Sequence, residues 1–292
     1  MSTVAPRHLL AIVAITVIWG LNLVVSKLGV RELAALQFTT LRFVLLALLT
    51  WPFLRVVRGK MGAMFVAALL CGGLNFALLF AGLAIAKNVS SVAIASQLGV
   101  PFTTMLSVAL LGETVRWRRW SGIALSFAGV MVMGFDPQVF AYWPSLVLAI
   151  ASAFVGALGV ISVKRLTEFK PLEMQAWFTW ISLPLLAALT AVASPIGLDG
   201  LQALSPTTWG AVAYTAIAGS LIGHTAFYYL VQRYPVTSVA PLTVLSPVFS
   251  VVFGVTLLHD VLTPRLLAGG VLTLTGVLII QTRERRLTDT GS

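Results

Sequence analysis

Apolar runs long enough to cross a lipid bilayer recur from one end of this 292-residue chain to the other. A run of about 17–25 such residues crosses the hydrocarbon core as a helix, because unsatisfied backbone groups cannot face lipid. Only 10% of the residues are charged, against roughly 25% in soluble domains, which argues against a large soluble α/β protein. The pattern predicts an all-α integral membrane protein with ten transmembrane helices, at residues 9–28, 35–55, 62–85, 89–111, 119–135, 143–163, 173–194, 208–231, 236–258 and 266–282.

The basic residues are distributed unequally between the two ends of these spans. Fourteen of the 19 Lys and Arg residues fall in loops on the side of the N-terminus, four fall on the other side, and Arg42 lies within a span. Cytoplasmic loops carry the excess of Lys and Arg, so we predict that both termini are cytoplasmic. The net charge of +10 is dispersed over small clusters, which does not indicate a nucleic-acid partner.

Two segments of the chain repeat each other. Residues 89–133 align without a gap on residues 236–280, at an offset of 147, and the match includes Gly122 with Gly269 and Gly129 with Gly276. We therefore predict two five-helix repeats, at 1–140 and 141–292. Five is an odd number, so the second repeat is inverted relative to the first. Inverted repeats around a midplane site are typical of secondary transporters.

Several motifs resemble a known family. IWGLN (18–22) with VVSK (24–27), TLRF (40–43) and LLGETVRWRRWSGIALSFAGVMVM (110–133) are similar to segments of EamA-type proteins of the drug/metabolite transporter superfamily. The second repeat departs from the pattern, with His259 and Asp260 where the first has Gly-Glu. The resemblance is greatest to bacterial amino-acid exporters. It implies a multi-pass exporter of small metabolites in the bacterial inner membrane, with a central cavity lined by the first, third, fourth, sixth, eighth and ninth spans.

Polar side chains near the middle of the spans predict the lining of a shared cavity, because an amide in hydrocarbon needs partners or water. The alternative is that they only hydrogen-bond neighbouring helices together. The candidate set is Asn22, Asn75, Ser96, Gln97, His224, Thr243 and Ser246.

Aromatic residues flank several of these polar positions, and Trp19, Phe76, Trp177 and Tyr228 join the predicted cavity. Aromatic faces beside amides suit a substrate with an apolar body and a polar head, such as a neutral or aromatic amino acid, although many drugs share that description. All nine acidic residues fall in loops or near span ends, which argues against a carrier of lipophilic cations.

Two basic residues and three prolines are candidates for charge recognition and gating. The position of Lys27 and Arg42 near the outer ends of the spans allows two readings. They extend to the outer headgroups, or they have a functional role, either attracting a substrate carboxylate or pairing with Glu32. Pro101, Pro241 and Pro247 remove backbone hydrogen bonds, so each bend is either a pivot or a static kink.

The function predicted from these features is secondary-type export of small metabolites by alternating access, with neutral or aromatic amino acids as the expected substrates. Drugs or nucleobase-like compounds are alternative substrates, and a lipid scramblase is the alternative from another class. No phosphate-binding G-x-x-x-x-G-K-[ST] motif is present, and the three histidines are too scattered for an enzyme or metal site, so we expect no catalysis, cofactor or metal. His224 is the candidate for proton sensing. The expected partners are a small-molecule substrate and the lipid bilayer, and a monomer is the expected state.

Overall fold

The structure is a computed structural model that describes residues 6–111, 115–163, 166–195, 197–233 and 245–281. Within these ranges every regular element is helical. The first half contains α1 (Pro6–Gly29), α2 (Ala35–Thr50), η1 (Trp51–Phe53), α3 (Met61–Ala68), η2 (Leu69–Leu74), α4 (Asn75–Ile85), α5 (Val89–Ser96), α6 (Gly99–Leu111), α7 (Trp117–Gly134) and α8 (Pro137–Phe140). The second half contains α9 (Trp143–Val163), α10 (Pro171–Ala193), α11 (Leu198–Gln202), α12 (Pro206–Tyr214), η3 (Thr215–His224), α13 (Thr225–Arg233), α15 (Leu245–Leu258) and α16 (Pro264–Gln281).

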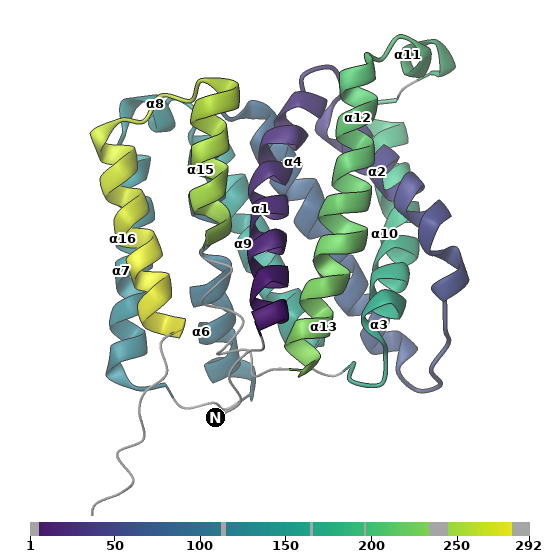
Figure 1. Cartoon of the computed structure of the whole chain (residues 1–292), viewed down its shortest axis with the longest axis horizontal. Helices are drawn as coiled ribbons and strands as arrows, with labels where there is room; N and C mark the ends of the chain where they lie inside the picture. Colours follow the sequence, from purple (N-terminus) through teal and green to yellow (C-terminus); the bar gives the residue numbers. More distant parts are fainter. Residues whose placement is uncertain (1–5, 112–114, 164–165, 196, 234–244, 282–292) are drawn as a thin grey trace, which may run out of the picture.

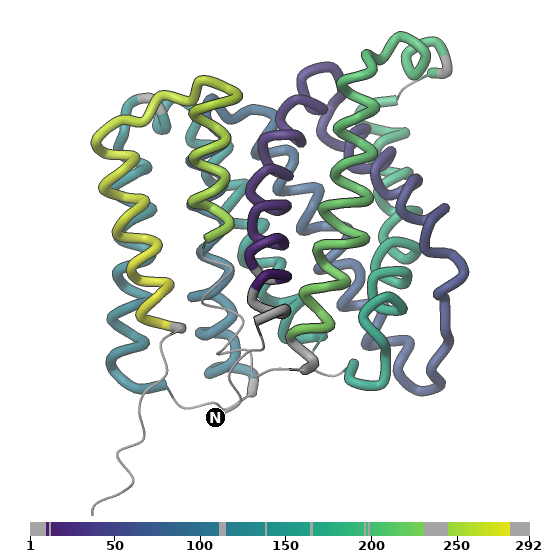
Figure 2. Tube along the Cα trace, viewed as in Figure 1, coloured from purple at the N-terminus to yellow at the C-terminus, as the bar shows by residue number. Residues whose placement is uncertain are grey.

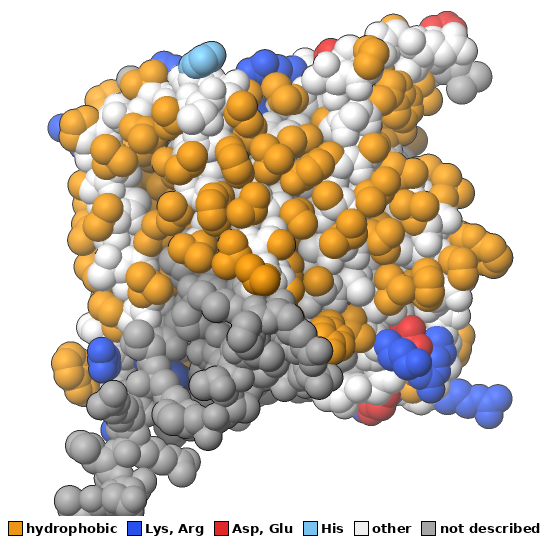
Figure 3. All heavy atoms as spheres, in the orientation of Figure 1, with side chains coloured by type: hydrophobic (Ala, Val, Ile, Leu, Met, Phe, Trp, Pro, Cys, Tyr) orange, Lys and Arg blue, Asp and Glu red, His pale blue; other side chains and the backbone are white. Residues whose placement is uncertain are grey.

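The helices stand side by side in one bundle (Figure 1). By length and composition, five stretches of the described residues can cross a membrane: Ala35–Phe53, Met61–Ile85, Val89–Leu110, Trp143–Val163 and Pro171–Ala193. Three shorter apolar helices lie at Val13–Gly29, Leu245–Leu258 and Pro264–Ile280. Apolar side chains cover much of the visible face, while Lys, Arg, Asp and Glu gather at its two edges (Figure 3). This distribution matches an apolar layer between two aqueous phases.

The first described helix begins and the last one ends at the same edge of the bundle. Figure 2 shows that α1 begins and α16 ends at the lower edge, while the loop between α1 and α2 and the short helix α11 lie at the upper edge. Both edges are held by polar contacts between distant segments. At the upper edge, the carboxylate of Asp260 accepts hydrogen bonds from the backbone N–H and the hydroxyl of Ser90, at 3.1 and 2.9 Å.

Helices α7 and α16 pack closely because glycines meet on both sides of the contact. They run in opposite directions (Figure 1). A Cβ added to Gly129 would lie 2.5 Å from the carbonyl oxygen of Gly269, and one added to Gly276 would lie 2.5 Å from that of Gly122. Between these crossings, the hydroxyl of Ser126 donates to the carbonyl of Thr273 and the hydroxyl of Thr273 donates to the carbonyl of Ser126, each at 3.4 Å.

Two of the long helices contain π-helical turns, which are rare and frequently occur at functional sites. The sequence predicts uninterrupted helices at 62–85 and 208–231, whereas the structure inserts η2 between α3 and α4 and η3 between α12 and α13. The two insertions occupy matching positions, since adding the repeat offset of 147 to residues 69–74 gives 216–221, within η3.

The predicted helix at 89–111 is also interrupted, at Gln97 and Leu98, where α5 ends before α6 begins. Pro101 lacks an N–H and cannot continue the α-helical pattern to Gln97. The N–H of Val100 instead donates to the carbonyl of Gln97 at 3.1 Å, which closes a tighter turn. The first part of the predicted helix at 236–258 lies outside the described residues.

Candidate functional site

A cavity of about 530 Å³ lies between helices of the two halves. Its walls come from α1, α2, η2, α4, α6, α7, α9 and α10, from η3 and α13, and from the ends of α5, α15 and α16. Of the residues proposed from the sequence, eight line this one cavity: Trp19, Asn75, Phe76, Ser96, Gln97, His224, Tyr228 and Ser246. The structure thus brings together side chains that are up to 227 positions apart in the chain.

Aromatic rings gather around His224 on one wall of the cavity. The ring centroid of His224 lies 5.2 Å from Trp19, 6.0 Å from Phe76 and 6.2 Å from Tyr228. Phe227 lies 5.2 Å from Trp19 and also lines the cavity. Aromatic faces at these separations form a stable apolar surface that can receive a flat or branched apolar group.

Two amides on the cavity wall differ in their hydrogen bonding. Asn75 Nδ2 donates to the carbonyl and the hydroxyl of Ser152, at 2.7 and 3.0 Å, and the Ser152 hydroxyl donates to the Asn75 carbonyl at 2.9 Å. Gly156 has no side chain to obstruct this amide. Gln97 Nε2, in contrast, is buried and has no hydrogen-bond partner among the described residues. Its donor is therefore available to a bound molecule.

The cavity continues along α6 past the residues found from the sequence. Val100, Thr103, Thr104 and Ser107 line it, which with Gly99 covers about 12 Å of helix at 1.5 Å per residue. The hydroxyls of Thr103 and Thr104 donate to carbonyls of their own helix. Extending the helical spacing from Ser96 and Gln97 by three and four residues at a time would have identified this stripe.

Three other polar residues on the wall are absent from the sequence-based set: Cys71, Gln175 and Arg119. Arg119 lies in the first turn of α7, and its Nε is buried with no hydrogen-bond partner from the described ranges. The sequence places it among basic loop residues, and only the approach of α7 to α6 brings it to the cavity.

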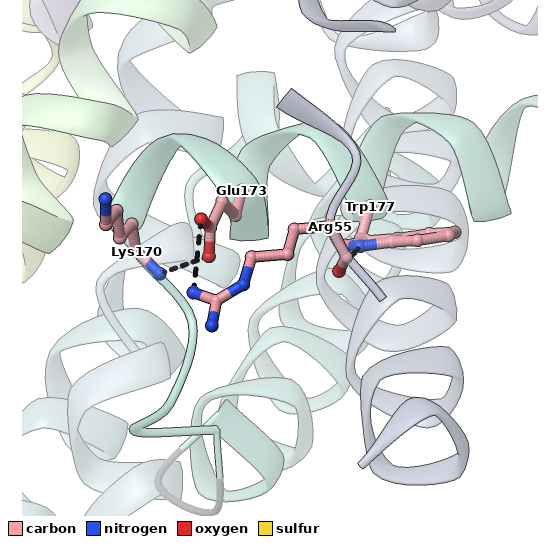
Figure 4. A network of polar contacts seen from close by, with 4 residues as sticks. All are labelled: Arg55, Lys170, Glu173 and Trp177. Atoms are coloured by element: carbon pink, nitrogen blue, oxygen red, sulfur yellow. Dashed lines mark hydrogen bonds and ion pairs between the residues drawn. The ribbon is translucent and has the colours of Figure 1, made fainter. Parts of the chain in front are cut away.

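Two of the proposed cavity residues do not line the cavity. Asn22 faces η3, where a side chain on Gly219 would overlap its Oδ1, and no described residue donates a hydrogen bond to that buried oxygen. Trp177 Nε1 donates to the carbonyl of Arg55 at 2.8 Å, beside the ion pair of Arg55 with Glu173 at 3.6 Å (Figure 4). Trp177 therefore anchors α10 to the loop after η1. Thr243 lies outside the described residues.

The proposed charge and gating residues lie in different environments. Lys27 Nζ donates to the carbonyls of Leu83, Ala84 and Ala86 at the end of α4. Arg42 is fully buried, so it does not extend to the headgroups; its Nη2 donates to the hydroxyl of Ser220. Neither residue forms an ion pair with Glu32 within the described residues.

The three prolines can be placed only in part. Pro101 is buried in the first turn of α6 and Pro247 is buried in the first turn of α15. Pro241 lies outside the described residues. In the described part of the chain, no group of three or more His, Cys, Asp or Glu side chains is arranged to hold a metal ion.

Comparison with known proteins gives matches over almost the whole chain. The sequence pattern of the EamA-like transporter family matches residues 7–135 and 143–282. A probable amino-acid metabolite efflux pump of Escherichia coli strain K12 is 28% identical over 273 residues, covering 91% of each chain. The uncharacterized inner membrane transporter YedA of the same organism is 26% identical over 282 residues, covering 92% of this chain and 89% of the relative.

Another relative matches a smaller part of the chain. A probable terminal-alkyne amino-acid exporter of Streptantibioticus cattleyicolor is 26% identical over 187 residues, covering 62% of this chain and 60% of its own. One solved crystal structure has a TM-score of 0.65 at 18% identity, covering 94% of this chain and 96% of the other. At that identity the likeness concerns the fold.

Proposed function

Because the chain belongs to the EamA-like transporter family, we propose that it exports small metabolites, namely amino acids or close derivatives with apolar or aromatic bodies, across the bacterial inner membrane. The observation that carries this proposal is the cavity of about 530 Å³, where an aromatic wall faces polar groups from both halves. Trp19 and Phe76 suit an apolar body, and Gln97 and His224 suit a polar head. The relatives named for efflux of amino-acid metabolites and for amino-acid export support this class of substrate.

The proposed architecture is ten membrane crossings in two inverted repeats, residues 1–140 and 141–292. Ser126 and Thr273 support it, because they are 147 positions apart and exchange hydrogen bonds across two antiparallel helices. When a two-fold axis in the membrane plane relates two positions, each makes the same contact to the other, as these two residues do. The matching positions of η2 and η3 and the two segments matched by the family pattern also support the division.

The proposed mechanism is alternating access, in which the two halves tilt around the cavity and open it to either side in turn. The break between α5 and α6, created by Pro101, lies on the cavity wall at Gln97 and supplies one bending point. By the repeat offset, residues 97–101 correspond to residues 244–248, which include Pro247. The transport step requires binding and movement, with no reacting side chain.

A flux assay in proteoliposomes tests this proposal. Vesicles with the purified protein are loaded with radiolabelled phenylalanine, leucine, glutamate or lysine, and efflux is compared with that of protein-free vesicles. We expect saturable efflux of phenylalanine and leucine. Gln97→Ala should raise KM by about tenfold, because a free donor to the substrate is lost. Gln202→Ala, at an exposed position in α11, is the matched control and should transport normally.

The outcomes separate the proposal from its alternatives. Efflux of none of these amino acids, with efflux of a drug or a nucleobase instead, would replace the substrate class and keep the transporter. Equilibration of fluorescent lipids between leaflets, without saturable efflux of any soluble compound, would establish a scramblase and contradict the proposal.

A further inference from the structure

Arg42 carries a positive charge in the interior of the bundle, and no carboxylate of the described residues forms an ion pair with it. The side chain is fully buried, in the middle of α2. Its Nη2 donates to the hydroxyl of Ser220, while Nε and Nη1 have no hydrogen-bond partner in the part of the chain that the structure describes. A buried guanidinium with unused donors is costly unless an anion or several acceptors satisfy it.

The guanidinium lies directly behind the wall of the cavity. Its central carbon is 4.4 Å from the ring centroid of Phe76 and 5.3 Å from that of Phe80. Phe76 also lines the cavity, whereas Arg42 does not. The ring of Phe76 therefore covers the charge, and cation–π attraction stabilises this covered arrangement. A rotation of one aromatic side chain would expose the two unused donors to a molecule in the cavity.

The described wall of the cavity offers no negatively charged side chain to a positive group of a substrate. Among the described lining residues, Arg119 is the one Lys, Arg, Asp or Glu. No carboxylate therefore lines the described wall. Among the described acidic residues, Asp260 accepts hydrogen bonds from Ser90 and Glu173 pairs with Arg55, and neither lines the cavity. The undescribed segment 234–244 contains no Asp or Glu in its sequence.

We infer that the cavity recognises its substrate through a carboxylate, bound by Arg42 once Phe76 turns aside, and that an ammonium group on the substrate is dispensable. A guanidinium binds a carboxylate through two parallel N–H···O bonds, and in Arg42 the unused Nη1 and the second N–H of Nη2 can form such a pair. The apolar body then rests against Trp19 and the rings around His224. This inference rests on the proposed function, and it adds that 2-hydroxy and 2-oxo acids with apolar bodies are substrates alongside the corresponding amino acids.

Three compounds of one shape test the inference in proteoliposomes. Phenylalanine carries both charges, phenyllactate keeps the carboxylate and replaces the ammonium by a hydroxyl, and phenylalaninamide keeps the ammonium and replaces the carboxylate by an amide. We expect phenylalanine and phenyllactate to leave the vesicles at rates within a few fold of each other. We expect kcat/KM for phenylalaninamide to be about 10- to 100-fold lower, the loss expected for hydrogen bonds to a charged group.

Variants of Arg42 separate recognition from a structural role. In Arg42→Gln, kcat/KM for phenylalanine should fall about 10- to 100-fold, whereas the slow efflux of phenylalaninamide should change little, so that the preference for the carboxylate disappears. Arg42→Lys should recover part of the preference. A purely structural role would lower both rates equally. Arg58→Gln, at an exposed arginine, is the matched control and should keep the preference.

The ranking of the three compounds by the unaltered protein decides the inference even if Arg42→Gln fails to fold. Efflux of phenylalaninamide as fast as that of phenylalanine would overturn it and leave the proposed function standing. Failure of phenyllactate alone would also overturn it, since the ammonium would then be required. Efflux of none of the three compounds, nor of leucine, would overturn the proposed function itself.

Discussion

At the scale of single residues, Lys27 illustrates how backbone carbonyls accommodate a charged side chain that has no ion pair with any described residue. Its Nζ lies 2.7 Å from the carbonyl of Leu83 and 3.2 Å from that of Ala84, and it also donates to Ala86, where α4 ends. The last carbonyls of a helix have no partner in the helix and carry its negative partial charge. Lys27 therefore ties α1 to the end of α4.

Replacing this lysine tests the contact. Lys27→Met keeps the length of the side chain but removes its donors, and we expect it to destabilise the protein by about 2 kcal/mol, the contribution of hydrogen bonds to a charged group. Thermal unfolding in detergent measures the change. Lys87→Met, at an exposed position, should unfold like the unaltered protein. Equal unfolding temperatures for the two variants would exclude the proposed role of Lys27.

Glu32, in the loop between α1 and α2, provides a pH-dependent contact. Its carboxylate accepts a hydrogen bond from the backbone N–H of Ser205 at 3.0 Å, and hydrogen bonds from Ser205 and Thr208 lower the pKa of Glu32. Because the pKa is lower in the folded state than in the unfolded state, the contact stabilises the protein above the ordinary glutamate pKa of about 4.3. That stabilisation disappears as the pH falls through the lowered value.

The substitution Glu32→Gln should therefore lower the unfolding temperature near neutral pH. The difference from the unaltered protein should shrink below about pH 4. Unfolding temperatures in detergent from pH 3 to pH 8 measure this difference. A difference that grew toward low pH would contradict the stated direction of the pKa change.

At the scale of helices, the contact between α7 and α16 depends on the absence of side chains. Gly129→Ala should destabilise the protein by about 1–3 kcal/mol, because its Cβ would lie 2.5 Å from the carbonyl oxygen of Gly269 and the helices would have to separate. Gly62→Ala in α3 is the matched control, since no atom lies within 4 Å of its added Cβ. Unfolding in detergent should show a loss for the first variant and none for the second.

How far the sequence predicts these helices depends on what breaks them. The lengths of the apolar runs predict the helix at 143–163 with the bounds observed for α9. The π-helical turns of η3 could not be predicted from the local sequence. In the structure distant side chains contact them: Trp19 Nε1 donates to the carbonyl of Gly219 at 3.2 Å, and Arg42 donates to the hydroxyl of Ser220. The break at Gln97 could have been predicted more closely from Pro101.

The residues of the candidate site could also be predicted only in part from the sequence. Asn75 and His224 are polar residues in apolar helices, and this local contrast was sufficient to identify them as candidates for the cavity wall. The position of a residue along a helix does not give the direction in which its side chain points. The sequence therefore predicts Asn22 in the cavity, whereas it faces η3. Arg119 was missed for the opposite reason, since its sequence neighbours Arg116 and Arg118 are exposed and only the packing of α7 turns Arg119 inward.

At the scale of the whole molecule, the distribution of basic residues predicts its orientation. We expect both termini in the cytoplasm and α11, which lies at the opposite edge of the bundle, outside it (Figure 1). Green fluorescent protein fused to the C-terminus should fluoresce, and alkaline phosphatase inserted after Gly200 should be active. Active alkaline phosphatase at the C-terminus and none at Gly200 would establish the reverse orientation.

The lack of a carboxylate on the described cavity wall has a consequence for the energy source of export. A bacterial cytoplasm is electrically negative, and moving one charge through 100 mV releases about 2.3 kcal/mol, which corresponds to a concentration ratio of about 50-fold. Phenyllactate carries one negative charge outward, so its efflux from vesicles should accelerate when valinomycin and a potassium gradient make the interior negative. Phenylalanine has no net charge, and its efflux should respond far less. Voltage would then drive the export of carboxylic acids without a coupled ion, while zwitterionic amino acids would leave only down their own concentration gradients.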